Sequence, residues 1–245
     1  MPISSSGHLV FFQSLFGLKE QPIFFDVMLH FGTLLAVMVY FRADIWEIIQ
    51  GVMVTLIGKE ESKQRGKLFL WIILATLPTG LIGILFKGWF ESLFSKPKIV
   101  GVMLLITGFV LWFTRWAKKD WKKIEKMGWM DSILIGIAQG LAIIPGISRS
   151  GATISTGLFC SLDRELSGKF SFLLSIPAIL GATVLEFQKI ESGSEVWVSL
   201  VGMAISFCFG IFSLKFLMKI IRMGKISSFS YYCWGMGLLM ILLVK

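Results

Sequence analysis

Residues 133–162 read ILIGIAQGLAIIPGISRSGATISTGLFCSL, and this stretch decides the fold. It is almost entirely apolar, yet it is longer than one membrane-spanning helix, which needs roughly 17–25 residues. The polar segment PGISRSG at 145–151 interrupts it in the middle. Proline and glycine end a helix, and a serine after them can cap a new one. The pattern predicts two half-helices joined by a turn, a re-entrant hairpin whose backbone must be buried in protein or line an aqueous cavity.

The rest of the chain has the composition of a membrane protein. Of its 245 residues, 55% are hydrophobic and only 16% are charged, against roughly 25% charged in a soluble domain. Six further apolar runs are long enough, or nearly so, to cross a bilayer. They lie at residues 23–41, 68–86, 99–114, 170–185, 196–217 and 229–244. We therefore expect an all-α integral membrane protein with six transmembrane helices plus re-entrant half-helix hairpins.

The basic residues indicate the orientation of the chain. With one hairpin between the third and fourth spans, the loops at 42–67, 115–131, 163–169 and 215–228 share one face and hold 17 of the 24 Lys and Arg residues. Basic loops mark the cytoplasmic side, where they face anionic lipid. The net charge of +9 thus fits a bilayer protein, and we expect no nucleic-acid partner. The start of the chain has no cleavable signal peptide pattern, so the spans themselves are expected to direct insertion.

The turn at 145–151 has a counterpart near the start of the chain. PISSSGHL at 2–9 resembles PGISRSGAT at 145–153 once one residue is inserted. The aligned pairs are Ser4 with Ser148, Ser5 with Arg149, Ser6 with Ser150 and Gly7 with Gly151. Because three spans follow each motif, the second copy must be inverted, and its turn should meet the first near the midplane of the membrane.

One membrane domain, residues 1–245, is therefore predicted to hold an inverted-topology repeat. Repeat one covers 1–130 and repeat two covers 131–245. A half-helix at 131–144 precedes the second turn, whereas one methionine precedes the first, so we expect either that the first arm of repeat one is missing or that the chain start is set too late.

Arg149 is the most informative residue of the two turns. An Arg at the centre of a span costs roughly 2.5–3.5 kcal/mol on insertion scales, and its fork of donors suits a phosphate. Free N–H groups at the start of a half-helix also attract anions. The serines could instead serve only as helix N-caps. Because the same pattern occurs in two turns, we favour a role in binding an anion. The candidate phosphate-binding residues are Ser4, Ser6, Gly7, Ser148, Ser150, Gly151 and Thr153. His8, in the first turn, is a candidate general base or nucleophile.

With these two motifs the chain resembles the undecaprenyl-diphosphate phosphatases, the bacitracin-resistance family. Further likeness lies in FDVML at 25–29, KFSFLLSIP at 169–177 and LGATVLE at 180–186. The resemblance implies hydrolysis of undecaprenyl diphosphate to the monophosphate and inorganic phosphate, which recycles the lipid carrier of bacterial cell-wall synthesis. It implies an enzyme of the bacterial plasma (inner) membrane whose site opens to the periplasm. It also implies that Ser5, His8 and Arg149 are catalytic.

The same resemblance implies a divalent cation, Mg or Ca, and a polyprenyl diphosphate lipid as the partner within the bilayer. A homodimer is allowed. The family carries a Glu-containing half-helix before the first motif, whose acids hold metal or activate a group. This chain departs from that pattern, so its metal ligands are unknown and are expected upstream of Met1.

Several alternatives stay open at this point. Either Ser5 or His8 could attack or activate water. A transporter or flippase of an anionic lipid also fits, because inverted repeats with broken helices are common there, and so does an inactive truncated copy. Lipid phosphatases with SGH and SR boxes need a His a few residues past the Arg. Ser155 and Thr156 occupy that region, so this class is excluded.

Overall fold

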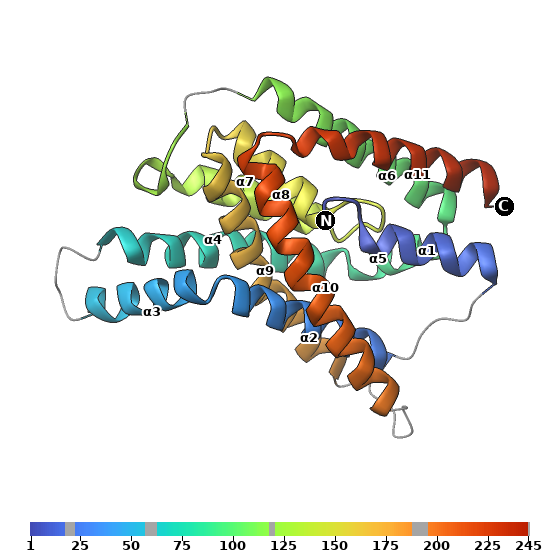
Figure 1. The fold of residues 1–245 in the computed structure, drawn as a ribbon, viewed down its shortest axis with the longest axis horizontal. Coiled ribbons are helices and arrows are strands. Elements are labelled where there is room, and N and C mark those ends of the chain that lie inside the picture. The colour runs from blue at the N-terminus through green and yellow to red at the C-terminus, as the bar shows by residue number, and fades with distance from the viewer. Residues whose placement is uncertain (18–22, 57–62, 118–120, 188–195, 245) are drawn as a thin grey trace.

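The computed structural model describes residues 1–17, 23–56, 63–117, 121–187 and 196–244, and helices make up nearly all of them (Figure 1). Within these ranges the only β feature is a single bridge between Lys122 and Leu162. The long helices are α1 Ser5–Phe16, α2 Ile23–Tyr40, α3 Arg42–Leu56, α4 Lys63–Leu85, α5 Lys87–Phe94, α6 Pro97–Phe113, α7 Trp129–Leu141, α8 Arg149–Phe159, α9 Arg164–Phe187, α10 Val196–Arg222 and α11 Phe229–Leu243. Three short 3₁₀ turns are η2 Thr114–Trp116, η3 Ile124–Lys126 and η4 Ile226–Ser228.

Each of the six predicted spans coincides with a helix, which confirms an all-α integral membrane protein. Helices α4, α6, α9, α10 and α11 are each long and apolar enough to cross a membrane alone. Helix α2 reaches that length only together with α3, to which it is bent by 74°. In Figure 1 the end of α3 and the start of α4 lie at the left, whereas the α5–α6 connection and the C-terminus lie at the right.

The prediction of a loop at 42–67 is wrong for the first part of that range, because residues Arg42–Leu56 form α3. Trp46, Ile49 and Met53 are exposed on one side of this helix, at the three- and four-residue spacing of an amphipathic stripe. Asp44 and Glu47 lie on the opposite side. They lower the mean hydropathy of the segment, so a search for apolar runs does not find this helix. The Lys169 ammonium pairs with Asp44 and ties α3 to the start of α9.

The predicted re-entrant hairpin is present as α7 and α8. The two helices have 13 and 11 residues, so at 1.5 Å per residue they extend about 20 and 17 Å. Neither can cross a hydrocarbon core of about 30 Å. Helix α7 packs on α4, while α8 packs on α7, α9 and α6. The irregular backbone between α7 and α8 is thus enclosed by other helices, as a membrane interior requires.

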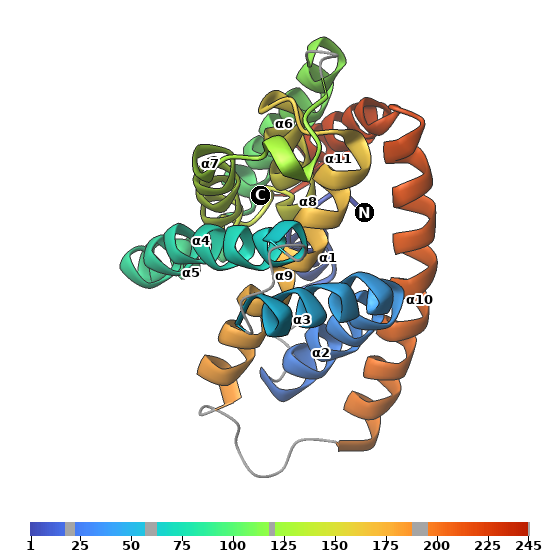
Figure 2. The same ribbon diagram turned by 90° about the vertical axis from the view of Figure 1, so that its left-hand side faces the viewer.

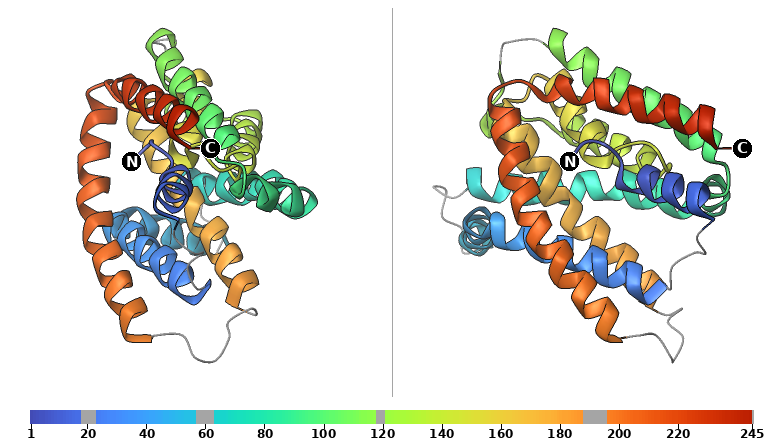
Figure 3. Two further views of the ribbon diagram at one scale, coloured as in Figure 1. Left: turned by 90° about the vertical axis from the view of Figure 1, so that its right-hand side faces the viewer. Right: turned by 45° about the vertical axis from the view of Figure 1, so that its right-hand side comes forward.

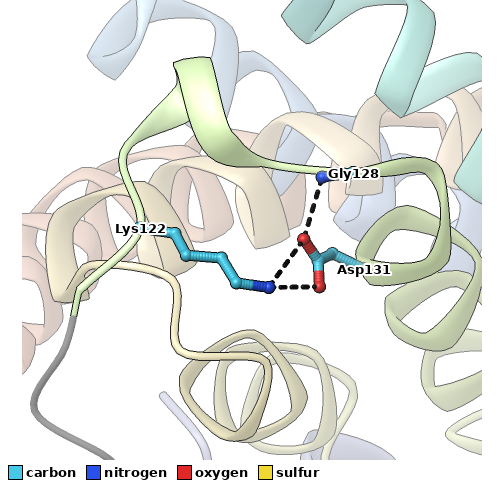
Figure 4. A network of polar contacts seen from close by, with 3 residues as sticks. All are labelled: Lys122, Gly128 and Asp131. Atoms are coloured by element: carbon cyan, nitrogen blue, oxygen red, sulfur yellow. Dashed lines mark hydrogen bonds and ion pairs between the residues drawn. The ribbon is translucent and has the colours of Figure 1, made fainter.

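The open end of the hairpin is held by Lys122 (Figure 4). Its ammonium lies 3.1 and 3.3 Å from the two oxygens of Asp131, and Asp131 also accepts a 2.9 Å hydrogen bond from the Gly128 N–H. The Lys122 backbone donates to the Ser161 carbonyl and accepts from the Asp163 N–H. This one segment therefore links the start of α7 to the end of α8.

The closed end of the hairpin depends on Gly146. Its φ is +95°, a conformation that costs L-residues energy, and an added Cβ would collide with the carbonyl oxygen of Val100 on α6. A side chain at this position would thus strain the turn and push it away from α6. Only glycine lets the chain turn here and pack against α6 at once.

The inverted repeat, with halves at 1–130 and 131–245, stays a prediction. Two correspondences support it. Helices α1 and α8 each begin behind a capping serine, Ser4 and Ser148. The last helices of the two halves, α6 and α11, lie side by side (Figures 1 and 2). Gly101 and Gly237 lie in this contact, where the backbone of each helix approaches the other closely; small residues permit such contacts between membrane helices.

We predict that Gly146→Ala destabilises the protein by about 1–3 kcal/mol, the cost of a strained backbone conformation, because both the positive φ and the Val100 contact oppose a methyl group. Thermal unfolding in detergent measures the loss. Gly80→Ala is the matched control, since Gly80 lies within α4 with no atom within 4 Å of an added Cβ. Equal unfolding temperatures for the two variants would contradict the assignment.

Candidate functional site

The first turn is organised by Ser4. This residue has a φ of +59°, and its hydroxyl oxygen accepts a 3.2 Å hydrogen bond from the Gly7 N–H, which caps α1. The same hydroxyl lies 3.2 Å from the Ser6 hydroxyl. Ser5, the first residue of α1, is exposed. The turn therefore presents hydroxyls and N–H groups at the positive end of a helix, where anions are favoured.

The second turn repeats this arrangement. The Ser148 hydroxyl accepts a 3.2 Å hydrogen bond from the Gly151 N–H and caps α8. In addition, Thr107 of α6 donates its hydroxyl to the Gly146 carbonyl at 3.0 Å and accepts from the Ser148 N–H at 3.1 Å. Thr107 is 3% exposed. A helix of the first half thus fixes the turn of the second half.

The sequence gives one weak signal for Thr107. It is a hydroxyl residue inside the apolar run at 99–114, and a buried hydroxyl generally needs a hydrogen-bond partner. The sequence alone does not indicate that its partners are Gly146 and Ser148, which lie 39 and 41 residues away.

The two turns, far apart in sequence, contact each other. A Cβ on Gly7 would lie 3.3 Å from the Gly146 Cα, and one on Gly151 would lie 3.5 Å from the Pro2 Cβ. The Ser150 hydroxyl donates a 3.3 Å hydrogen bond to the Met1 carbonyl. In Figure 1 and in the right panel of Figure 3 the N-terminus accordingly lies in the middle of the bundle and not at its edge.

Arg149 begins α8 at this junction. Its side chain is partly buried, and its Nη1 atom is fully buried with no hydrogen-bond partner among the described residues. An unpaired cationic donor is costly in a medium of low dielectric constant. Arg149 lies at the N-terminus of α8, where the first N–H groups and the positive end of the helix dipole also favour an anion. These groups together form a cationic corner suited to an anion.

Thr153 is also at the start of α8, but its hydroxyl is already engaged. It donates to the Arg149 carbonyl at 2.8 Å and contacts the hydroxyl of Ser171 on α9. The side chain is 1% exposed. The contact fastens the first turn of α8 to α9, and a direct role of Thr153 in binding phosphate stays a prediction.

His8 is hydrogen-bonded through both ring nitrogens. Nδ1 lies 2.7 Å from the Ser4 carbonyl oxygen, and Nε2 lies 2.7 Å from the hydroxyl of Tyr232 on α11. The two rings are stacked, with centroids 5.6 Å apart. The neighbouring Cys233 is fully buried and its thiol donates to the Pro2 carbonyl at 3.7 Å. Helix α11 therefore contacts the first turn at two successive residues.

The residues around the turns do not form a metal centre of their own. Among the described residues no group of three or more His, Cys, Asp or Glu side chains could hold a metal ion. The turns supply hydroxyls and a guanidinium, whereas Mg²⁺ and Ca²⁺ bind most firmly through carboxylate oxygens. The described site thus fits an anion and does not by itself fit a divalent cation.

Two hollows lie at the surface of the bundle. One, of about 580 Å³, adjoins the first turn, and its mainly apolar lining includes Met1, Ile3, Phe216, Ile220, Phe229 and Tyr232. The other, of about 640 Å³, lies beside Lys122 and Asp131 at the start of α7. That helix separates the second hollow from the two turns by about 20 Å, so only the first belongs to the site.

Comparison with known proteins gives one consistent result. Residues 1–239 match the family described as bacitracin resistance protein BacA. An undecaprenyl-diphosphatase of Carboxydothermus hydrogenoformans is 44% identical over 249 residues, which cover 99% of this chain and 91% of the relative. An undecaprenyl-diphosphatase of Halothermothrix orenii is 42% identical over 247 residues, covering 99% and 92%. One of Desulfatibacillum aliphaticivorans is 42% identical over 249 residues, covering 97% and 90%.

We predict that Thr107→Val lowers the thermal stability of the protein, because it leaves the Gly146 carbonyl and the Ser148 N–H without their partner. Each unpaired buried group costs about 1–3 kcal/mol. Thr107→Ser is the control, since it keeps the hydroxyl and loses only a methyl group. If the serine variant unfolds at the same temperature as the valine variant, the two hydrogen bonds do not hold the turn.

Proposed function

The chain belongs to the bacitracin resistance protein BacA family and hydrolyses undecaprenyl diphosphate to the monophosphate and inorganic phosphate, and we propose that the two turns at 2–9 and 145–153 form the site of this reaction. The protein is a membrane-embedded hydrolase whose substrate is a lipid. In bacteria this reaction recycles the lipid carrier of cell-wall synthesis, and the transporter alternative is not favoured.

The observation that carries the site is the unpaired Nη1 of Arg149. A buried cation without a partner is poorly solvated, and a diphosphate supplies an opposite charge and hydrogen-bond acceptors. The planar guanidinium can donate hydrogen bonds to two oxygens of one phosphate at once. Arg149 is therefore assigned to the phosphate that carries most of the charge in the transition state.

The starts of α1 and α8 complete the binding of the diphosphate. Ser5 and Ser6 lie in the first turn of α1, and Ser150 lies in the first turn of α8. Their backbone N–H groups are at helix N-termini, where the dipole favours negative charge. Since the two turns touch through Gly7 and Gly146, one headgroup can contact both. Fixed donors of this kind stabilise developing charge without reorganising, which is the largest contribution in phosphoryl transfer.

His8 and Ser5 are the two groups proposed to act on the bond that breaks. Ser5 is exposed beside the turn, and His8 has an imidazole that can receive a proton. One of them attacks the terminal phosphorus or activates the water that does so. The apolar hollow beside Met1 and Ile3 adjoins the first turn.

A divalent cation, Mg or Ca, is part of the proposal through the family resemblance. When bound, such an ion would neutralise charge on the phosphates. The described residues contribute no carboxylate set for it, so none of the steps above is assigned to the metal. The bacterial plasma membrane, a periplasmic opening of the site and a homodimer also belong to the proposal.

Release of inorganic phosphate from undecaprenyl diphosphate by the purified protein tests the site. We predict that Arg149→Ala lowers kcat on the order of 100-fold or more, as expected when a main electrostatic donor is lost. Arg149→Lys should recover only part of the activity, because an ammonium lacks the planar fork. Arg222→Ala is the control, since Arg222 pairs with Glu165 at an exposed position. If Arg149→Ala keeps the wild-type kcat, the assignment of the active site to the two turns is contradicted.

The metal requirement is tested separately. We predict that a chelator abolishes phosphate release by the wild-type protein and that added Mg²⁺ or Ca²⁺ restores it, while the unfolding temperature changes little. Full activity in the chelator would contradict the cation as cofactor and leave the assignment of Arg149 in place. Movement of the lipid across vesicles without phosphate release would instead favour the transporter.

A further inference from the structure

The surroundings of His8 extend to a residue that neither motif contains. Its Nδ1 faces the Ser4 carbonyl oxygen at 2.7 Å. A carbonyl oxygen only accepts, so Nδ1 carries the proton and donates it. In the neutral ring Nε2 is then the acceptor, and the Tyr232 hydroxyl 2.7 Å away must donate to it. The hydrogen bonds thus fix one tautomer of His8.

Two further contacts hold Tyr232 in this position. Its ring stacks on the imidazole at an interplanar angle of 10°, which limits rotation of both rings. The next residue, Cys233, is fully buried against the Pro2 carbonyl, so the start of α11 is packed against the first turn. Tyr232 is also 45% exposed and lines the apolar hollow. The phenol therefore contacts His8 and also borders this hollow.

We propose that Tyr232 is a positioning residue for the phosphatase reaction, which holds the imidazole of His8 in one orientation and one tautomer through its hydrogen bond to Nε2. This inference rests on the proposed function, since it requires that His8 takes part in the reaction. Without the phenolic hydroxyl the imidazole is held at one end only, by Ser4, and can rotate about its Cβ–Cγ bond. Loss of orientation lowers the rate more than it lowers binding of the diphosphate, which Arg149 and the two turns provide.

Tyr231 offers a matched control within the same helix. It precedes Tyr232, is 57% exposed, and its hydroxyl accepts a 3.3 Å hydrogen bond from Arg115. Its ring packs against Trp112, with centroids 5.5 Å apart. Tyr231→Phe and Tyr232→Phe thus each remove a phenolic hydroxyl and one side-chain hydrogen bond from neighbouring tyrosines. Only one of the two hydroxyls contacts His8.

The first measurement is phosphate release from undecaprenyl diphosphate. We expect Tyr232→Phe to lower kcat about tenfold, the effect of one net hydrogen bond, with KM changed less than about twofold. Tyr231→Phe should keep the wild-type kcat, and His8→Ala should lose activity. If Tyr232→Phe keeps the wild-type kcat while His8→Ala is inactive, the inference about Tyr232 is overturned and the proposed function stands. Wild-type kcat in His8→Ala overturns the role of His8 in the proposed function.

The second measurement reads the imidazole directly and does not depend on activity. The chain has two histidines, His8 and His30, so ¹⁵N-histidine labelling in detergent gives few signals, and a His8→Ala sample assigns them. We expect His8 to be the Nδ1–H tautomer with a hydrogen-bonded Nε2 in the wild-type protein and in Tyr231→Phe. The Nε2 signal should move in Tyr232→Phe. Identical His8 signals in all three proteins would overturn the inference, whatever the rates.

Discussion

The structure depends on one electrostatic constraint, a guanidinium kept inside a membrane protein without an anionic partner of its own. Transfer of such a group out of water is costly, and the buried Nη1 of Arg149 has no compensating acceptor among the described residues. In the proposed site a diphosphate offsets this cost, because it is more highly charged than any side chain. The arrangement of α7, α8 and the first turn follows from the need to hold this cation at a fixed place.

The support for that cation comes from other parts of the chain. Thr107 on α6 fixes the turn before Arg149, and Ser171 on α9 fastens the helix after it. Gly7 and Gly146 let the two turns approach to contact distance. Among the described residues of the two turns, the buried side-chain atom without a hydrogen-bond partner is Nη1 of Arg149. The hydrogen-bonded groups therefore hold the turns in place, whereas the unpaired guanidinium is the group proposed to bind the substrate.

Local patterns in the sequence predict those features that are set by neighbouring residues. The break at Pro145 and Gly146, the capping by Ser148 and the apolar runs are all of this kind, and the structure contains each of them. Helix α3 is missed, because its acidic side lowers the hydropathy of a segment whose other side is apolar. Thr107, Tyr232 and Cys233 are missed for a different reason. The partners of the last two lie 224 and 231 residues away, and one sequence holds no signal for such pairs.

The central claim is that the headgroup of the lipid lies between the two turns and against Arg149. An experimental structure of the protein with a non-hydrolysable methylene-diphosphonate analogue of the lipid tests it most directly. The account predicts phosphonate oxygens within about 3.5 Å of the Arg149 guanidinium, the limit of a hydrogen bond, and in contact with both turns. A headgroup bound instead in the hollow beside Lys122 and Asp131, with Arg149 still unpaired, would contradict it.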